Sequence, residues 1–182
     1  LVGSVSLSPI SDVGGLADAA RDGTLNDDQK VTLARFLAAL HVEYPDVINL
    51  DDYRRGAAKT EWDALLGCQS DPSARDVAAR IPAADLKPAT AEAVDTLHGF
   101  LKKVNLPQAP ALAPMMVMYG DDDPLVPAAW TDAALDAACK LGDVITIGRE
   151  PQPQPISDTQ LAWIADRFAA KPVPNDCAGR TP

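Results

Sequence analysis

A short apolar segment followed at once by three carboxylates constrains the fold of this chain most. The run Met115–Tyr119 is apolar, Gly120 ends it, and Asp121–Asp123 come before Val126-Pro127 and an Ala-rich segment. This order predicts a buried β-strand with carboxylates at its carboxyl end, and a helix after the turn. In open α/β sheets that end of a strand is where ligands and catalytic groups lie. We therefore expect an α/β fold with a candidate site at this turn.

The composition is that of an ordinary globular protein. The 182 residues are 47% hydrophobic and 23% charged, which fits one domain with a substantial core. No apolar run reaches the roughly 20 residues that a membrane helix needs, so we expect the chain not to span a membrane. The formal net charge of −10 argues against nucleic-acid binding, because nucleic-acid readers need clustered Lys and Arg.

Two features suggest that the natural protein is longer. The segment Leu1–Ser8 reads as a buried strand, yet no initiator Met or lead-in precedes it. The chain also contains three Cys, and an odd number in a secreted protein implies a free thiol or a partner elsewhere. We therefore expect the sequence to be the C-terminal part of a larger polypeptide.

The sequence between residues 11 and 108 contains almost only helical patterns. Asn26 and Gln29 predict a capping box that starts the strongest helix, and Pro45 ends it. The stripe expected to be buried on this helix includes Phe36, Leu37, Leu40 and Val42. Further helices are expected over residues 12–21, 57–66 and 73–80 and from Pro88 to about 104. We therefore predict a helical cap over residues 11–108.

The pattern after this region is typical of a parallel sheet. We expect strands over residues 115–119 and 143–147, and helices over 128–141 and 157–168. Leu161, Ile164 and Phe168 are the expected buried face of the last helix. Strand, helix, strand, helix in this spacing predicts a right-handed crossover unit. Residues 1–10 and 109–182 are therefore predicted to form the α/β core.

Several segments together resemble the C-terminal half of a secretory lipase. They are Ser8-Pro9-Ile10-Ser11-Asp12 after the first strand, Gly23-Thr24-Leu25, Tyr44-Pro45, Cys68, the Gly-x-x-Asp-x-x-Val-Pro turn, Ala138–Gly142, and Trp163–Phe168 with Cys177. That family consists of α/β-hydrolases with a helical cap that act on lipid esters outside the cell. The resemblance covers nearly all of this chain and about half of the family's length. It implies the C-terminal part of an α/β-hydrolase sheet with a large helical cap insertion.

Ester hydrolysis on that fold needs a Ser nucleophile, a His base and a carboxylate that orients the His. The resemblance assigns the carboxylate to Asp123 and places the Ser in the N-terminal half, because no G-x-S-x-G motif is present here. It implies a lipid or acyl-ester ligand and no cofactor. The cap residues that we expect to line the acyl pocket are Phe36, Leu37, Leu40, Trp62, Leu97 and Leu101.

The His that the resemblance implies is missing. It belongs in the loop over residues 148–158, which contains no His, and amides such as Gln152 and Gln154 cannot act as a base. His41 and His98 fall on cap helices, where packing or surface roles are expected. Asp123 has an equally good alternative as a residue that caps its own turn. A second hypothesis is therefore an inactive lipid-binding protein, or an envelope subunit that docks a partner protein.

The cysteines predict disulfides and an extracytoplasmic location. A bridge between Cys139 and Cys177 would join the irregular C-terminal tail to the helix after the acid turn. The resemblance implies the same pair and leaves Cys68 to join a Cys of the N-terminal half. Disulfides are typical of secreted or cell-envelope proteins. No His, Cys, Asp or Glu cluster has the spacing of metal ligands, and Asp121 and Asp122 are expected to be solvated.

Overall fold

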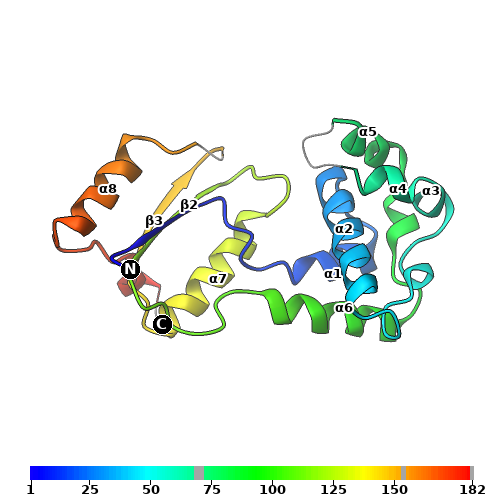
Figure 1. The fold of residues 1–182 in the computed structure, drawn as a ribbon, viewed down its shortest axis with the longest axis horizontal. Coiled ribbons are helices and arrows are strands. Elements are labelled where there is room, and N and C mark those ends of the chain that lie inside the picture. Colours follow the sequence, from blue (N-terminus) through cyan, green and yellow to red (C-terminus); the bar gives the residue numbers. More distant parts are fainter. Residues whose placement is uncertain (68–71, 153–154, 181–182) are drawn as a thin grey trace. The chain divides into compact units, whose positions relative to one another are not determined.

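The computed structural model describes residues 1–67, 72–152 and 155–180, which form two compact units (Figure 1). Unit 1 combines Leu1–Val13 with Val104–Pro182, and unit 2 is Gly14–Lys103. The boundaries expected from the sequence, after residues 10 and 108, lie a few residues away. Unit 1 is mixed α/β, whereas every regular element in the described part of unit 2 is helical.

Unit 1 is built on a three-stranded parallel sheet. Its strands are β1 (Ser4–Leu7), β2 (Met115–Gly120) and β3 (Ile145–Glu150), in the order β1-β2-β3. In the register, Ser4 pairs with Met115 and Met115 pairs with Ile145. The central strand is the most buried, as expected for a strand with neighbours on both sides.

Helices cover both faces of this sheet. The face that carries Val117, Tyr119 and Ile145 packs against Leu135 and Ala138 of α7 (Ala128–Lys140). Side chains alternate along a strand, so Thr146 belongs to the opposite face, where its hydroxyl accepts a hydrogen bond of 3.1 Å from Trp163 of α8 (Asp158–Phe168). Because a helix covers each face of the sheet, the strands carry apolar residues on both faces.

The buried face of α8 differs from the sequence prediction. Ser157 and Gln160 form the capping box that starts the helix, but Leu161 is 53% and Phe168 76% exposed. Trp163 and Arg167 are buried instead, because Gly3 leaves room for them against the first strand. A Cβ at Gly3 would lie 2.8 Å from Cγ of Arg167.

Unit 2 consists of short and medium helices around its own core. The sequence prediction of a capping box by Asn26 and Gln29 is confirmed. The α-helices are α1 (Gly15–Asp22), α2 (Asp27–Glu43), α3 (Gly56–Thr60), α4 (Trp62–Leu65), α5 (Pro72–Arg80) and α6 (Ala91–Val104), with 3-10 turns η1 (Leu50–Asp52) and η2 (Ala83–Leu86). In the described ranges, no helix combines the length and apolarity needed to cross a bilayer.

Three details of unit 2 correct the sequence prediction. The helix expected over residues 57–66 is two helices, interrupted at Glu61. Val42 is 82% exposed, because the last turn of α2 carries it away from the core. The helix expected from Pro88 begins only after Thr90, whose hydroxyl accepts a hydrogen bond from the amide of Ala93 at 3.1 Å. Local capping by Thr90 therefore sets the start of α6.

Candidate functional site

The carboxylate proposed as a catalytic acid holds its own turn. Asp123 lies three residues beyond the end of β2 and is half-buried. Its Oδ1 accepts hydrogen bonds from the amides of Leu125 and Val126, both at 2.9 Å. These amides precede α7, so Asp123 caps the turn and not the first turn of the helix. Both of these hydrogen bonds go to Oδ1.

The acid turn lies directly beside the loop that follows β3. The amide of Asp121 donates to the carbonyl of Glu150 at 2.9 Å, and the amide of Asp122 donates to the carbonyl of Pro151 at 3.1 Å. The side chain of Gln152 donates to Oδ2 of Asp122 at 3.1 Å. The structure thus brings together the turn expected to carry the acid and the loop expected to carry the base. Gln154 of that loop lies outside the described residues.

Both His residues have partners within unit 2. Nδ1 of His41, near the end of α2, lies 2.6 Å from the carbonyl oxygen of Ile48. Nε2 of His98, on α6, lies 3.3 Å from a carboxylate oxygen of Asp18. These contacts agree with the packing and surface roles expected from the sequence.

The sequence analysis missed a polar network that begins at Tyr119 of β2, just before the acid turn. The hydroxyl of Tyr119 donates to Asp132 at 2.6 Å, and the guanidinium of Arg180 contacts Asp132 at 2.7 Å and Asp136 at 2.9 Å. Arg149 adds an ion pair of 3.3 Å with Asp132. The network ties β2, β3, α7 and the C-terminal tail together.

Burial and hydrogen bonding shift the pKa values in this network. Burial raises the pKa of the Tyr119 hydroxyl, and its hydrogen bond to Asp132 raises it further. Burial alone would raise the pKa of Asp132, but hydrogen bonds from Tyr119 and Arg180, together with two positive charges, lower it below its ordinary value. Asp132 is therefore ionised at neutral pH, so the network is a charged structural cluster.

The sequence contains weak signals for this network. Asp132 and Asp136 are four residues apart and therefore share one side of α7. Tyr119 and Arg149 pair directly across β2 and β3, so a correct register would have placed them together. Nothing in the irregular tail indicates Arg180, because its position depends on the path of the chain after Phe168.

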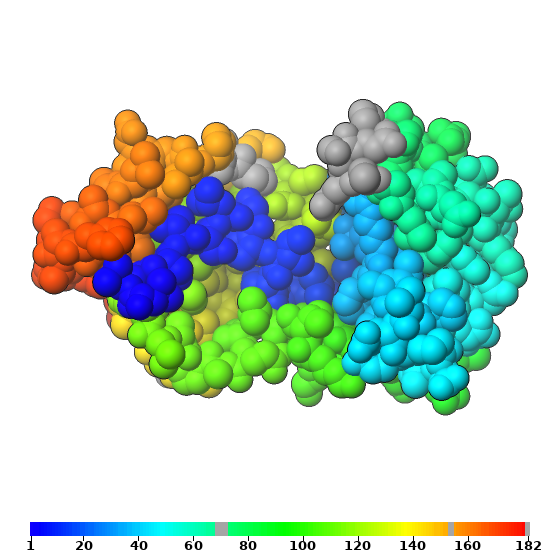
Figure 2. All heavy atoms as spheres, in the orientation of Figure 1, coloured from blue at the N-terminus to red at the C-terminus, as the bar shows by residue number. Residues whose placement is uncertain are grey.

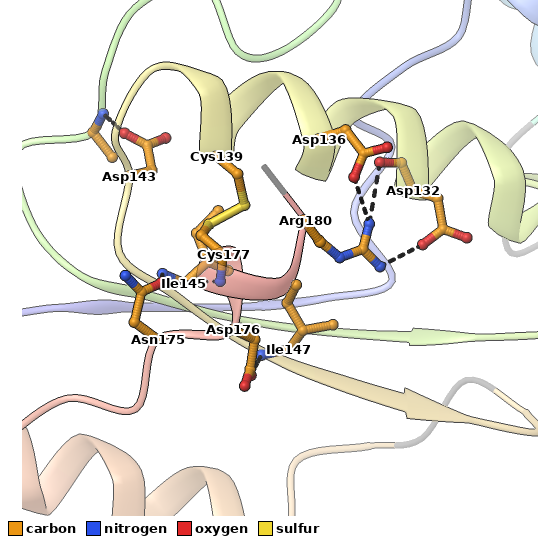
Figure 3. Close-up of a disulfide and its surroundings, with 11 residues drawn as sticks. Asp132, Asp136, Cys139, Asp143, Ile145, Ile147, Asn175, Asp176, Cys177 and Arg180 are labelled. Atoms are coloured by element: carbon orange, nitrogen blue, oxygen red, sulfur yellow. Dashed lines mark hydrogen bonds and ion pairs between the residues drawn. A yellow bond between two sulfur atoms is a disulfide. The ribbon is translucent and has the colours of Figure 1, made fainter. Parts of the chain in front are cut away.

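The C-terminal tail is fastened along the free side of β3 (Figure 3). The predicted pair Cys139 and Cys177 forms a disulfide, with Cα atoms 5.2 Å apart. Asn175 accepts a hydrogen bond from the amide of Ile145 at 3.3 Å, and Asp176 accepts one from the amide of Ile147 at 2.7 Å. The third cysteine, Cys68, lies outside the described residues.

The residues expected to line an acyl pocket lie mainly in the core of unit 2. Phe36 is half-buried. The other five are buried among the core residues of that unit: Leu37, Leu40, Trp62, Leu97 and Leu101. The structure gives these five a packing role, and their contact with a ligand stays a prediction.

Neither the described residues nor the comparisons with known proteins identify the chemistry of this chain. Within residues 1–67, 72–152 and 155–180, no group of three or more His, Cys, Asp and Glu residues could hold a metal ion. Comparison with family models, with curated proteins and with solved structures finds no match. The function must therefore be argued from the site itself.

Proposed function

We propose that this chain is the C-terminal part of a secreted, capped α/β-hydrolase of the lipase and esterase class, acting on acyl esters. The observation that carries the proposal is the acid turn of Asp123 beside the loop that follows the next strand. A triad on this fold requires those two segments to be adjacent, with the acid at the carboxyl end of a central strand. In this proposal Asp123 is the triad acid.

The environment of Asp123 supports the assignment. Oδ1 alone accepts the two turn hydrogen bonds from Leu125 and Val126, so holding the turn does not require Oδ2. The neighbouring carboxylate of Asp122 already reaches the side chain of Gln152. A general base located in the loop after β3, as Gln152 is, would lie close to the acid turn.

The surface beside β1 supports a further polypeptide segment as a partner. Among the described residues no strand pairs with the outer edge of β1. A pocket of about 450 Å³ between residues 1–5 and α8 adjoins it, with the exposed side chain of Phe168 at its rim. Nη1 of Arg167 is buried there without a hydrogen-bond partner in the described part of the chain. In Figure 2 the N-terminal segment, in dark blue, lies against α8, in orange. We propose that the N-terminal half of the protein, with the nucleophilic Ser, continues the sheet here.

The disulfide supports a secreted or cell-envelope location. Bridges of this kind persist in oxidising compartments, and Cys139–Cys177 joins segments 38 residues apart.

The second candidate is an inactive relative that binds lipid or an envelope protein partner. The observation that favours it is Gln152, which occupies the loop expected to carry the base and donates to Asp122. The side-chain amide of Gln does not titrate near neutral pH, so Gln152 cannot act as the general base. Such a protein would bind its ligand without cleaving it.

The full-length protein distinguishes the two candidates when it is incubated with a short p-nitrophenyl ester and with a fluorophosphonate probe. The hydrolase proposal predicts ester turnover and covalent labelling, because labelling requires an activated Ser. Binding of the ester without turnover or labelling would favour the inactive relative.

Two variants separate catalysis from turn capping. Asp123→Asn keeps an oxygen that can accept from Leu125 and Val126, so its melting temperature should match that of the wild type. Its turnover should fall on the order of 10³–10⁴-fold if Asp123 orients the base. Asp122→Asn is the matched control and should retain most of the activity. Unchanged turnover in Asp123→Asn would remove the catalytic role.

A further inference from the structure

The side chain of Arg149 joins the acid turn to the helix that follows it. Arg149 belongs to β3, where it pairs with Tyr119 of β2. Its Nε contacts Oδ1 of Asp121, the first residue after β2, at 2.5 Å. Its Nη1 contacts Oδ2 of Asp132 on α7 at 3.3 Å. One guanidinium therefore holds the chain on both sides of Asp123.

The shape of the guanidinium and an aromatic ring fix its position. The group is planar and carries its N–H donors in a rigid fork, so it binds two carboxylates only in set directions. Its central carbon lies 5.6 Å from the centre of the Tyr119 ring, which is a cation–π contact. The hydroxyl of the same ring donates to Asp132 at 2.6 Å. Arg149 thus contacts β2, α7 and the acid turn at once.

The acid turn also requires a positive partner. Asp121, Asp122 and Asp123 are consecutive, and carboxylates this close repel one another. Among the described residues, Arg149 is the only cation that forms an ion pair with this turn. The hydrogen bond to Asp121 raises the pKa of the Arg149 guanidinium. Arg149 therefore stays charged and offsets part of the repulsion beside the proposed triad acid.

This ion pair matters for the position of the turn more than for stability. The side chains of Arg149 and Asp121 are both 48% exposed, and exposed ion pairs contribute little to the free energy of unfolding. Position is a stricter requirement, because a displacement of about 1 Å can lower a catalytic rate roughly 100-fold. The backbone hydrogen bonds to the loop after β3 come from Asp121 and Asp122. The guanidinium adds the link from this start of the turn to α7.

We propose that Arg149 is a positioning residue of the candidate site, which fixes the turn of Asp123 between β3 and α7 so that the carboxylate meets the general base in one orientation. This inference rests on the proposed hydrolase function, in which Asp123 orients that base. Arg149 acts through Asp121 and takes no part in the chemical step.

Three variants of the full-length protein test this role. Arg149→Gln removes the charge and the fork, so it should lower kcat for a short p-nitrophenyl ester about tenfold and leave KM near the wild-type value. Arg149→Lys keeps the charge but replaces the fork by one ammonium group, so it should recover only part of the loss. Arg75→Gln, which removes an exposed ion pair of 3.1 Å with Asp28, is the matched control and should keep the wild-type kcat. Melting temperatures should change little in all three.

A double-mutant cycle shows whether Arg149 acts through Asp121. Asp121→Ala should lower kcat with KM unchanged, and the double variant should lose no more than Arg149→Gln alone, because both changes remove the same contact. Losses that multiply in the double variant would overturn the proposal. A wild-type kcat in Arg149→Gln, or complete recovery in Arg149→Lys, would overturn it as well.

Hydrogen exchange in the 182-residue chain separates this inference from the proposed function. Arg149→Gln should speed exchange at the amides of Leu125 and Val126, which Asp123 holds, and leave Ile145 at the start of β3 unchanged. A full-length wild type without ester turnover would overturn the hydrolase function, whereas faster exchange in the variant would still show that Arg149 holds the turn. Unchanged exchange at Leu125 and Val126 would overturn the positioning role whatever the activity.

Discussion

The two edges of the parallel sheet are finished in different ways. Along β3, side chains of the tail accept hydrogen bonds from the amides of Ile145 and Ile147. On the β1 side, the amide of Ser4 donates to Pro114, just before β2, and the amide of Ser8, just after β1, donates to Met118 of β2. The amides of Val5 and Leu7 therefore point to the other edge. No strand of the described residues pairs with that edge. One edge is covered and the other is open.

The two edges also differ in the groups that they present. A carboxylate such as Asp176 accepts hydrogen bonds but cannot donate one, so it satisfies the strand without extending the sheet. Natural proteins protect exposed edges in ways that prevent further pairing. The β3 edge is therefore the end of the sheet, whereas the β1 edge keeps the pattern of donors and acceptors that another strand needs.

Among changes at the covered β3 edge, loss of the disulfide should have the largest effect on stability. Cys139→Ser together with Cys177→Ser should lower the free energy of unfolding by roughly 2–4 kcal/mol, because the unfolded chain gains freedom over a long loop. Urea denaturation of oxidised wild type and of the double variant measures the difference. Identical midpoints would show that the tail holds β3 without the bridge.

Removing the acceptor at Asp176 should have a smaller effect. Asp176→Ala leaves the amide of Ile147 without its partner and should cost about 1 kcal/mol. Asp176→Asn keeps an acceptor and should cost less. Asp166→Ala, which breaks an exposed ion pair with Lys171, is the matched control and should change stability little. A larger loss in the control than in Asp176→Ala would contradict the role of the tail.

The ionised Asp132 of the tail network should make the stability of the protein depend on pH, with the smallest effect of the three. Because the folded pKa of Asp132 lies below its ordinary value of 3.8, its contribution is present above that value and is lost as the pH falls through the folded pKa. Asp132→Asn should therefore be destabilised relative to wild type at neutral pH, and the difference should shrink in acid. Thermal unfolding between pH 7 and about pH 2 measures this. A constant difference would contradict it.

The sequence predicted the order of elements in unit 1 because strand, turn and helix signals there are local. The strand over Met115–Tyr119 and the helix expected from residue 157 needed no tertiary information. The prediction of the buried face of α8 was wrong, because Gly3, which precedes β1 and is distant in sequence, leaves the space into which Trp163 and Arg167 pack. The turn contacts of Asp123 were foreseeable as capping. The position of Arg180 could not be predicted, because it depends on how the C-terminal tail returns to α7.

Hydrogen exchange at four amides tests the account most directly. In the 182-residue chain, the amides of Ile145 and Ile147 should be protected and those of Val5 and Leu7 should exchange rapidly. In the full-length protein, Val5 and Leu7 should become as protected as the other two, because the proposed N-terminal half then pairs with β1. Rapid exchange of Val5 and Leu7 in the full-length protein would contradict the account.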